Sequence, residues 1–179
     1  MEKFKNKYRT NSIRLKSWDY TNPWWYFVTV CTKNHKEYFG EIKNAKMVVN
    51  DIGRIAEKYW FEIPQHYEIV ELDYFVIMPN HLHGIIIINE TVETRHGVSL
   101  HENREFSKPI ANSLSTIINH FKGAVTRECN KQRLSFQWQP RFYDRIIRNE
   151  KELFNIRKYI KQKPLKWEIG KNFPENIDL

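Results

Sequence analysis

The chain has 179 residues, 41% hydrophobic and 15% aromatic, so it can bury a core of its own and is not a disordered chain. No apolar run approaches the length that spans a bilayer, which excludes an integral helical membrane protein. Lys and Arg number 29 against 21 Asp and Glu, and the formal charge of +8 mildly favours a polyanionic partner such as nucleic acid.

Cysteine usage and the N-terminus predict a cytoplasmic protein. Cys31 and Cys129 lie far apart and form no Cys-x-x-Cys pair, which argues against a disulfide framework or a cysteine zinc site. Residues 1–22 are basic and polar and contain no apolar signal-peptide segment. We expect one domain over residues 1–179, with residues 1–22 as a basic N-terminal extension.

The first half of the chain predicts a strand, a helix and two further strands. Aromatic and β-branched residues over 24–32 are typical of a strand. Residues 50–63 carry apolar side chains at helical spacing after a cap at Asn50, and the pattern stops before Pro64. Residues 67–77 and 84–88 are β-prone, and Pro79-Asn80 between them indicates the turn of an antiparallel pair.

The second half predicts a loop, a helix, a strand and a last helix. Residues 89–109 are polar and aperiodic, which predicts a flexible loop, and helical spacing resumes from Leu114 to Val125. Residues 142–147 indicate a short strand, and the last helix is expected to begin after Asn149 and to end at Pro164. The β-α-β-β-α-β order of the first six elements predicts an α+β fold: a ferredoxin-like antiparallel sheet with helices on one face, plus a C-terminal helix.

Two histidines, His81 and His83, stand at the polar end of an apolar run in "MPNHLHGIIII". Alternate residues of a strand share a face, so both imidazoles would project together while Leu82 turns into the core. Imidazole suits divalent transition metals, although two ligands do not complete a site. Histidines at a strand end can equally form hydrogen bonds to a neighbouring loop. The chain carries no H-E-x-x-H, G-x-S-x-G or Walker A motif.

Several motifs in order along the chain resemble one family. His81-Leu82-His83 matches the His-hydrophobic-His motif of the HUH single-tyrosine transposases. The stretches "FVIMPNHLHGIIII", "WQPRFYDRIIRNEKEL" and "KYIKQKP" resemble the REP-associated tyrosine transposases within that family, and the resemblance covers roughly residues 13–167.

This resemblance implies a ferredoxin-like core in which His81 and His83 hold Mg²⁺ or Mn²⁺, with Tyr159 on the C-terminal helix as the nucleophile. It further implies DNA transposition, in which single-stranded DNA is nicked and rejoined at hairpins of palindromic repeats through a 5′-phosphotyrosine intermediate. Relatives act as monomers or as dimers, so a homodimer remains open. A nearby cation suits this chemistry, because a phenol with a pKa of about 10 is a weak nucleophile at neutral pH.

Two positions leave alternatives in the site. Many relatives carry Asn four residues after the tyrosine, where this chain has Lys163, and a protonated ammonium cannot bind a cation. Gln162 then supplies the third ligand, or water completes a two-histidine site, or the protein is a catalytically weakened hairpin-DNA-binding protein. Tyr143 is the alternative nucleophile, and we interpret it as a structural or DNA-contacting residue.

Basic residues gather around the expected site with aromatic residues between them. This pattern is typical of a groove that follows a nucleic-acid backbone and stacks its bases, although a solvated helix face has the same composition. The expected DNA-binding residues are Arg14, Trp138, Arg141, Tyr143, Arg145, Arg148, Arg157, Lys158 and Lys163. A ferredoxin-like RNA-binding module would need an RNP1-type strand, and the sequence contains none.

Overall fold

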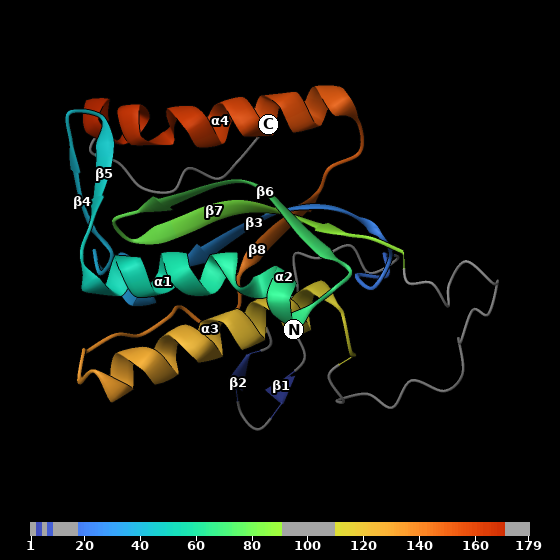
Figure 1. Cartoon of the computed structure of the whole chain (residues 1–179), viewed down its shortest axis with the longest axis horizontal. Coiled ribbons are helices and arrows are strands. Elements are labelled where there is room, and N and C mark those ends of the chain that lie inside the picture. Colours follow the sequence, from blue (N-terminus) through green and yellow to red (C-terminus); the bar gives the residue numbers. More distant parts are fainter. Residues whose placement is uncertain (1–2, 5–6, 9–17, 91–109, 171–179) are drawn as a thin grey trace.

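The computed structural model describes residues 3–4, 7–8, 18–90 and 110–170. Most of the expected N-terminal extension, including Arg14, and nearly all of the expected 89–109 loop lie outside these residues. The elements in chain order are β1 (Lys3–Phe4), β2 (Lys7–Tyr8), β3 (Trp24–Cys31), the 3₁₀ turn η1 (Lys33–His35), β4 (Gly40–Lys43), β5 (Lys46–Val49), α1 (Asp51–Phe61), α2 (Ile63–His66), β6 (Val70–Met78), β7 (His81–Ile88), α3 (Leu114–Lys131), β8 (Tyr143–Ile146) and α4 (Glu150–Ile169) (Figure 1).

A four-stranded antiparallel sheet forms the centre of the fold, with the strand order β6-β7-β3-β8. Strand β3 pairs with β7 along its whole length, from Trp24 opposite Ile88 to Cys31 opposite His81. The short strand β8 pairs with the other edge of β3. With α1 and α3 as the two crossover helices, this is the ferredoxin-like arrangement, and the expected α+β fold class is confirmed.

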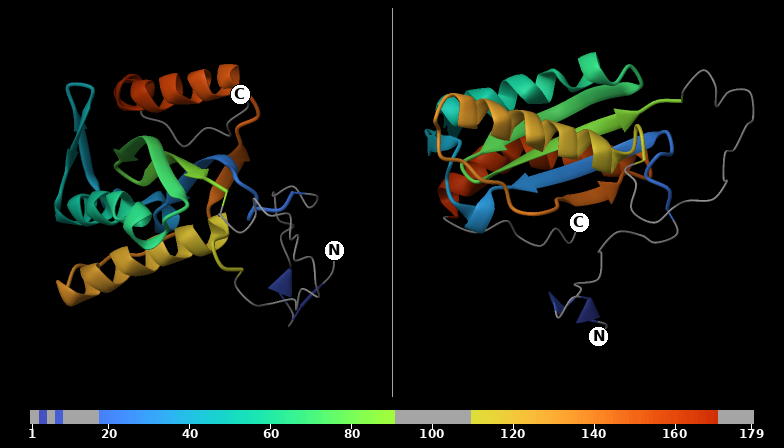
Figure 2. Two further views of the ribbon diagram at one scale, coloured as in Figure 1. Left: turned by 45° about the vertical axis from the view of Figure 1, so that its right-hand side comes forward. Right: turned by 90° about the horizontal axis from the view of Figure 1, so that it is seen from below.

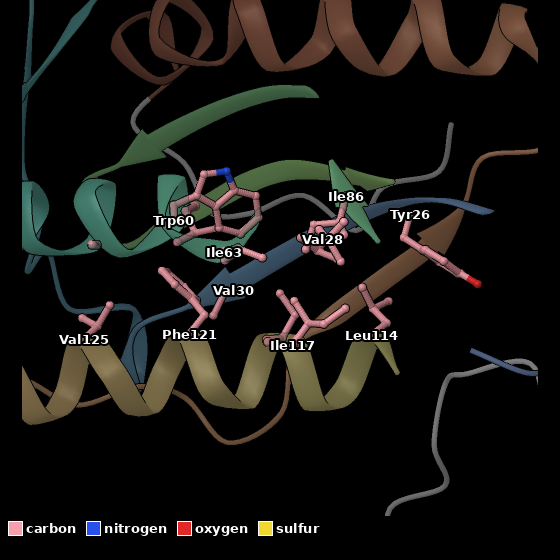
Figure 3. Close-up of a cluster of buried hydrophobic side chains, with 14 of the residues drawn as sticks. Tyr26, Val28, Val30, Trp60, Ile63, Ile86, Leu114, Ile117, Phe121 and Val125 are labelled. Atoms are coloured by element: carbon pink, nitrogen blue, oxygen red, sulfur yellow. The ribbon is translucent and has the colours of Figure 1, made fainter. Parts of the chain in front are cut away.

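Helices cover both faces of this sheet. Helices α1 and α3 lie on one face, and α4 crosses the opposite face (Figures 1 and 2). The larger hydrophobic core fills the space between the sheet and α1 and α3, where Val28 and Val30 meet Trp60 and Phe121 (Figure 3). This face holds most of the buried apolar area, which is the main driving force for folding.

A second, smaller core lies under α4. It contains Phe27 and Ile85 from the sheet and Leu153, Ile156 and Ile160 from the helix. The Asn149 side chain caps α4 by accepting a hydrogen bond from the backbone N–H of Glu152. The spacing of its three apolar residues turns one side of α4 onto the sheet.

Gly84 allows Trp60 to pack directly against the sheet. A Cβ at this position would lie 2.2 Å from a ring carbon of Trp60, which is fully buried. We expect Gly84→Ala to destabilise the protein by roughly 2–3 kcal/mol, because the bulky ring must shift in a closely packed core. Urea denaturation measures the change.

Gly123 provides the matched control, because a Cβ there would meet only the end of the Arg127 side chain, at 3.2 Å. On a helix, Gly123→Ala should stabilise by about 1 kcal/mol. Equal effects of the two substitutions would contradict the packing argument for Gly84.

Three features around the histidine pair and α4 differ from the sequence prediction. Helix α4 continues through Pro164 to Ile169, so the expected end at Pro164 is wrong. The β4–β5 hairpin was not expected, and it lies beside the C-terminal half of α4 (Figure 1). Strand β7 begins at His81 rather than at Gly84. Packing of the last turns of α4 against the hairpin and His81 offsets the hydrogen bond that proline cannot donate.

Among the described helices, none is both long and apolar enough to cross a membrane.

Candidate active site

His81 and His83 lie on the α4 face of the sheet, at the start of β7. Leu82 between them points into the opposite core, as the alternation of a strand predicts. Both imidazoles are buried, with exposures of 0% and 1%. Their Nε2 atoms lie 3.1 Å apart, so the two rings present the same nitrogen to one point.

Hydrogen bonds at the other ring nitrogens orient both imidazoles. The Asn80 side chain donates from Nδ2 to the carbonyl of His35, so its Oδ1 faces His81 and accepts from Nδ1 of that ring at 2.6 Å. The Thr29 hydroxyl contacts Nδ1 of His83 at 2.8 Å. Because Nδ1 of His81 carries the proton, its Nε2 presents a lone pair. Partners of this kind fix the ring orientation of metal-binding histidines.

Burial keeps the imidazole pair neutral. It lowers the pKa of His81 to about 3, and the charges of Lys163 and His35 lower it further in the same direction. Burial also lowers the pKa of His83 well below its usual range, with contributions from His81 and Lys163. Neutral imidazole is the form that binds a metal ion.

This neutrality predicts acid sensitivity of the metal-free protein. The unfolded chain protonates both imidazoles below about pH 6.5, whereas the folded chain keeps them neutral to a much lower pH. Their contribution to stability is therefore complete above pH 6.5 and is lost as the pH falls. Between pH 7.5 and 5.5 the free energy of unfolding should fall by about 2–3 kcal/mol for the pair. Urea denaturation in EDTA measures this. The double variant His81→Gln, His83→Gln should show a flatter profile, and an unchanged profile would contradict the assignment.

Tyr159 projects from α4 onto the histidine pair. Its hydroxyl lies 3.3 Å from Nε2 of His83, and its ring packs against His83 and Phe27 with centroid distances of 5.2 and 6.1 Å. Three groups of the expected chemistry, two imidazole nitrogens and a phenolic oxygen, thus meet at one end of the sheet. The phenolic oxygen of Tyr159 thus contacts one imidazole nitrogen, which in turn lies beside the second.

The last turns of α4 add positive charge and an aromatic ring to this place. Lys163 is 6% exposed, and its Nζ lies 5.0 Å from the centroid of the Tyr159 ring. Lys166 approaches the same ring at 5.9 Å. The ring of Trp167 lies 5.9 Å from that of His81, which depends on the continuation of α4 beyond Pro164. Trp167, Lys166, Asn80 and Thr29 were not anticipated from the sequence.

The histidine pair fits a divalent ion, although it does not complete a site. Two neighbouring ligands of an octahedral ion, each ~2.1 Å from it, lie about 3.0 Å apart, close to the observed separation of 3.1 Å. Within the described ranges, no group of three His, Cys, Asp or Glu residues could hold a metal. Gln162, the expected third ligand, is half-buried. Among the hydrogen bonds of the described residues, none joins its side chain to either imidazole. The charge of Lys163 opposes a cation here.

The alternative nucleophile, Tyr143, lies in the same row of the sheet. Thr29 pairs with His83 on one side and with Tyr143 on the other. Tyr143 therefore lies two strands from His83, roughly 10 Å across the sheet. Its side chain is 47% exposed, and its hydroxyl accepts from Gln139 Nε2 at 3.5 Å. Of the two tyrosines, the hydroxyl of Tyr159 is the one that contacts an imidazole.

Two of the expected DNA-binding arginines are engaged within the protein. Arg145 donates from Nε and Nη2 to one carboxylate oxygen of Glu152, at 2.9 and 2.6 Å. Arg157 donates from Nε to Asp73 at 2.8 Å and also lies over the Tyr74 ring. Both pairs join α4 to the sheet, and DNA would have to compete with these carboxylates for the two guanidinium groups.

The other expected DNA contacts divide between surface and core. Trp138 packs against Phe39, Phe121 and Phe136, and its indole N–H donates to the carbonyl of Lys122 at 3.1 Å. These contacts give its ring a packing role. The side chains that are exposed are Arg141, Tyr143, Arg148 and Lys158.

Comparisons with known proteins identify a shared fold and a relative. No protein-family model matches the chain. The structure is similar to that of a REP-associated tyrosine transposase bound to a REP hairpin, with a TM-score of 0.54 and 20% sequence identity over 94% of this chain and 79% of the other. An uncharacterised protein of Haemophilus influenzae strain Rd is 39% identical over 160 residues, which cover 88% of this chain and 89% of that protein. With this identity over nearly the whole of both chains, the protein belongs to the same family as the Haemophilus influenzae protein.

Proposed function

We propose that this protein nicks and rejoins single-stranded DNA at hairpin-forming repeats, with Tyr159 as the nucleophile. The observation that carries the proposal is the meeting of the Tyr159 hydroxyl with Nε2 of His83, at 3.3 Å, and of that nitrogen with Nε2 of His81, at 3.1 Å. The fold shared with a transposase that binds a REP hairpin supports it.

In the proposed reaction, the Tyr159 oxygen attacks a phosphodiester phosphorus. A Tyr–O–P bond forms, the bond from phosphorus to the 3′ oxygen breaks, the tyrosine loses its proton and the 3′ oxygen gains one. The products are a 5′-phosphotyrosine and a free 3′-hydroxyl. Attack of another 3′-hydroxyl on the phosphotyrosine reverses these changes and joins the strands without ATP, because each step exchanges one phosphodiester for another.

His81 and His83 would hold Mg²⁺ or Mn²⁺ in this scheme. Such an ion, when bound, supplies positive charge to the phosphate oxygens as negative charge builds up on them. Asn80 and Thr29 keep the two imidazoles oriented through their Nδ1 atoms. The packing of Tyr159 against Phe27 and His83 fixes the direction of its hydroxyl, which favours an aligned attack.

A hairpin-binding protein without catalytic activity is the second candidate. Lys163 favours it, because this buried side chain lies near both imidazoles and its positive charge acts on each of them. An ammonium at this position attracts a DNA phosphate but repels a divalent ion. Binding and cleavage therefore have to be measured separately.

A covalent-adduct assay tests the proposal. The protein is incubated with a labelled DNA hairpin carrying single-stranded flanks, in Mg²⁺, Mn²⁺ or EDTA, and is then separated on a denaturing gel. We expect a labelled protein band in either divalent ion and none in EDTA. Hairpin binding without an adduct in any divalent ion would favour the second candidate. Absence of binding would contradict both.

Replacing Lys163 by Asn tests how this lysine affects the site. Lys163→Asn removes a positive charge near the imidazoles and adds an amide oxygen one helical turn from Tyr159, so Mn²⁺ should bind roughly tenfold more tightly. Nicking should become faster. Isothermal titration calorimetry and adduct kinetics measure the two effects. Lys166→Asn, which alters a lysine 5.9 Å from the same ring, is the control and should change Mn²⁺ affinity less. Tighter Mn²⁺ binding with slower nicking would indicate that Lys163 contacts the phosphate.

A further inference from the structure

The turn formed by Thr32–Lys36 lies at the same end of the sheet as the histidine pair. It follows β3 directly, and the last residue of that strand, Cys31, pairs with His81. The backbone N–H of Thr32 donates to the carbonyl of Asn80 at 2.9 Å, immediately before His81 in the chain. The turn is therefore fixed beside the candidate active site although 45 residues separate His35 from Asn80.

The backbone of this turn adopts an unusual conformation. Asn34 and His35 both lie in the left-handed region, with φ values of 54° and 53°, where glycine is favoured over residues with a side chain. Hydrogen bonds hold it there: His35 N–H donates to Thr32, Lys36 N–H donates to Lys33, and the Thr32 hydroxyl donates to the carbonyl of Lys36 at 2.7 Å. Conformations of this kind persist where the surroundings enforce them and are frequent at functional sites.

His35 connects the turn to the metal-binding candidate His81. Its carbonyl accepts from Asn80 Nδ2 at 3.1 Å, and Oδ1 of the same Asn80 side chain accepts from His81. Nδ1 of the His35 ring is buried and has no hydrogen-bond partner in the part of the chain that the structure describes. Because Nδ1 is closed off from solvent, the nitrogen through which this ring can donate to a DNA phosphate is Nε2.

Lys33 and Lys36 give the turn a fixed positive charge. Lys33 Nζ is held by Gln137 Oε1 at 2.7 Å, and Lys36 Nζ lies 4.9 Å from the centroid of the Tyr38 ring. Both side chains are exposed, and neither forms an ion pair with a carboxylate of the described residues. They differ in this from Arg145 and Arg157, whose guanidinium groups are paired with carboxylates.

We propose that the Thr32–Lys36 turn binds a phosphodiester group of the DNA strand, next to the phosphate that Tyr159 attacks. Lys33 and Lys36 supply its positive charge, and the His35 ring donates a hydrogen bond to a phosphate oxygen. The inference rests on the proposed function and places the strand across the end of β3. Backbone contacts of this kind position DNA without reading its sequence.

The salt dependence of DNA binding tests the two lysines. In the double variant Lys33→Ala, Lys36→Ala, the slope of log affinity against log salt should decrease in magnitude by ~1.4, since each lost contact to a single strand removes ~0.7. The matched control is Lys58→Ala, Lys131→Ala, which removes the same charge from exposed positions on α1 and α3, helices on the face opposite α4 (Figure 1). This control should leave the slope unchanged. Equal slopes for the two double variants would overturn the proposal.

A pair of glycine substitutions tests His35 separately from the fold. His35→Gly and Asn34→Gly both relieve a left-handed residue, so each should maintain or raise the melting temperature. Only His35→Gly should weaken hairpin binding, by several fold, because only it removes the imidazole. Equal DNA affinity of the two variants would overturn the role of His35.

All binding measurements use the Tyr159→Phe background, so that cleavage does not interfere. Equal salt slopes for the two double-lysine variants would then refute DNA binding by the Thr32–Lys36 turn and would leave the nicking proposal intact. Absence of a covalent adduct in the wild-type protein would refute nicking, and the salt slopes would still decide whether the turn contacts DNA.

Discussion

Tyr159→Phe is expected to bind hairpin DNA almost as tightly as the wild-type protein and to form no covalent adduct. The substitution keeps the ring that packs against Phe27 and His83 and removes only the hydroxyl, which lies 3.3 Å from His83 Nε2. The loss of adduct should be complete, because among the described residues only the Tyr159 hydroxyl contacts an Nε2 atom of the histidine pair, whereas the Thr29 hydroxyl contacts Nδ1. Fluorescence anisotropy measures binding, and a denaturing gel measures the adduct.

Tyr143→Phe is the control for this experiment. Tyr143 lies in the same row of the sheet but at its exposed edge, so its hydroxyl should be dispensable for adduct formation. An adduct that survives Tyr159→Phe and disappears in Tyr143→Phe would show that Tyr143 is the nucleophile.

His81→Ala and His83→Ala should each abolish nicking and greatly weaken Mn²⁺ binding. Each substitution removes one of two neutral nitrogens that lie 3.1 Å apart, and a single imidazole binds a divalent ion poorly. Isothermal titration calorimetry with Mn²⁺ gives a readout that does not depend on catalysis. Circular dichroism verifies that the variants fold, since truncating a buried side chain leaves a cavity.

His66→Ala serves as the histidine control, because this exposed residue at the end of α2 lies outside the candidate active site. It should leave Mn²⁺ affinity and nicking unchanged. If both His81→Ala and His83→Ala bind Mn²⁺ as tightly as the wild-type protein, the proposal that these histidines hold the divalent ion is contradicted.

The common orientation of His81 and His83 could be predicted because it depends only on strand alternation. A period of two places both imidazoles on one face and Leu82 on the other, and the structure confirms this. The contacts of Asn80 and Thr29 with the Nδ1 atoms of the two imidazoles could not be predicted, because they depend on the pairing register of β3 and β7, which the sequence does not provide.

Features that depend on tertiary packing could not be predicted. The contact of Tyr159 with His83 requires the path of α4 across the sheet, and the pairing of Arg157 with Asp73 joins residues 84 positions apart. The Pro164 prediction failed because a local rule for proline was outweighed by packing of the last helical turns. The β4–β5 hairpin has only four residues in each strand, a signal too short for periodicity. Asn44 at its turn has a positive φ of 51°, as is typical of short hairpin turns.

Identification of the residue that carries DNA in the covalent adduct tests the central claim most directly. The wild-type protein is incubated with a hairpin substrate and Mn²⁺, the DNA is digested to a short remnant, and the protein is cleaved and analysed by mass spectrometry. The proposed mechanism predicts one modified peptide, with a nucleotide phosphate attached to Tyr159. A modification at Tyr143, or hairpin binding with no modified peptide in any divalent ion, would contradict the claim that Tyr159 and the histidine pair form a DNA-cleaving site.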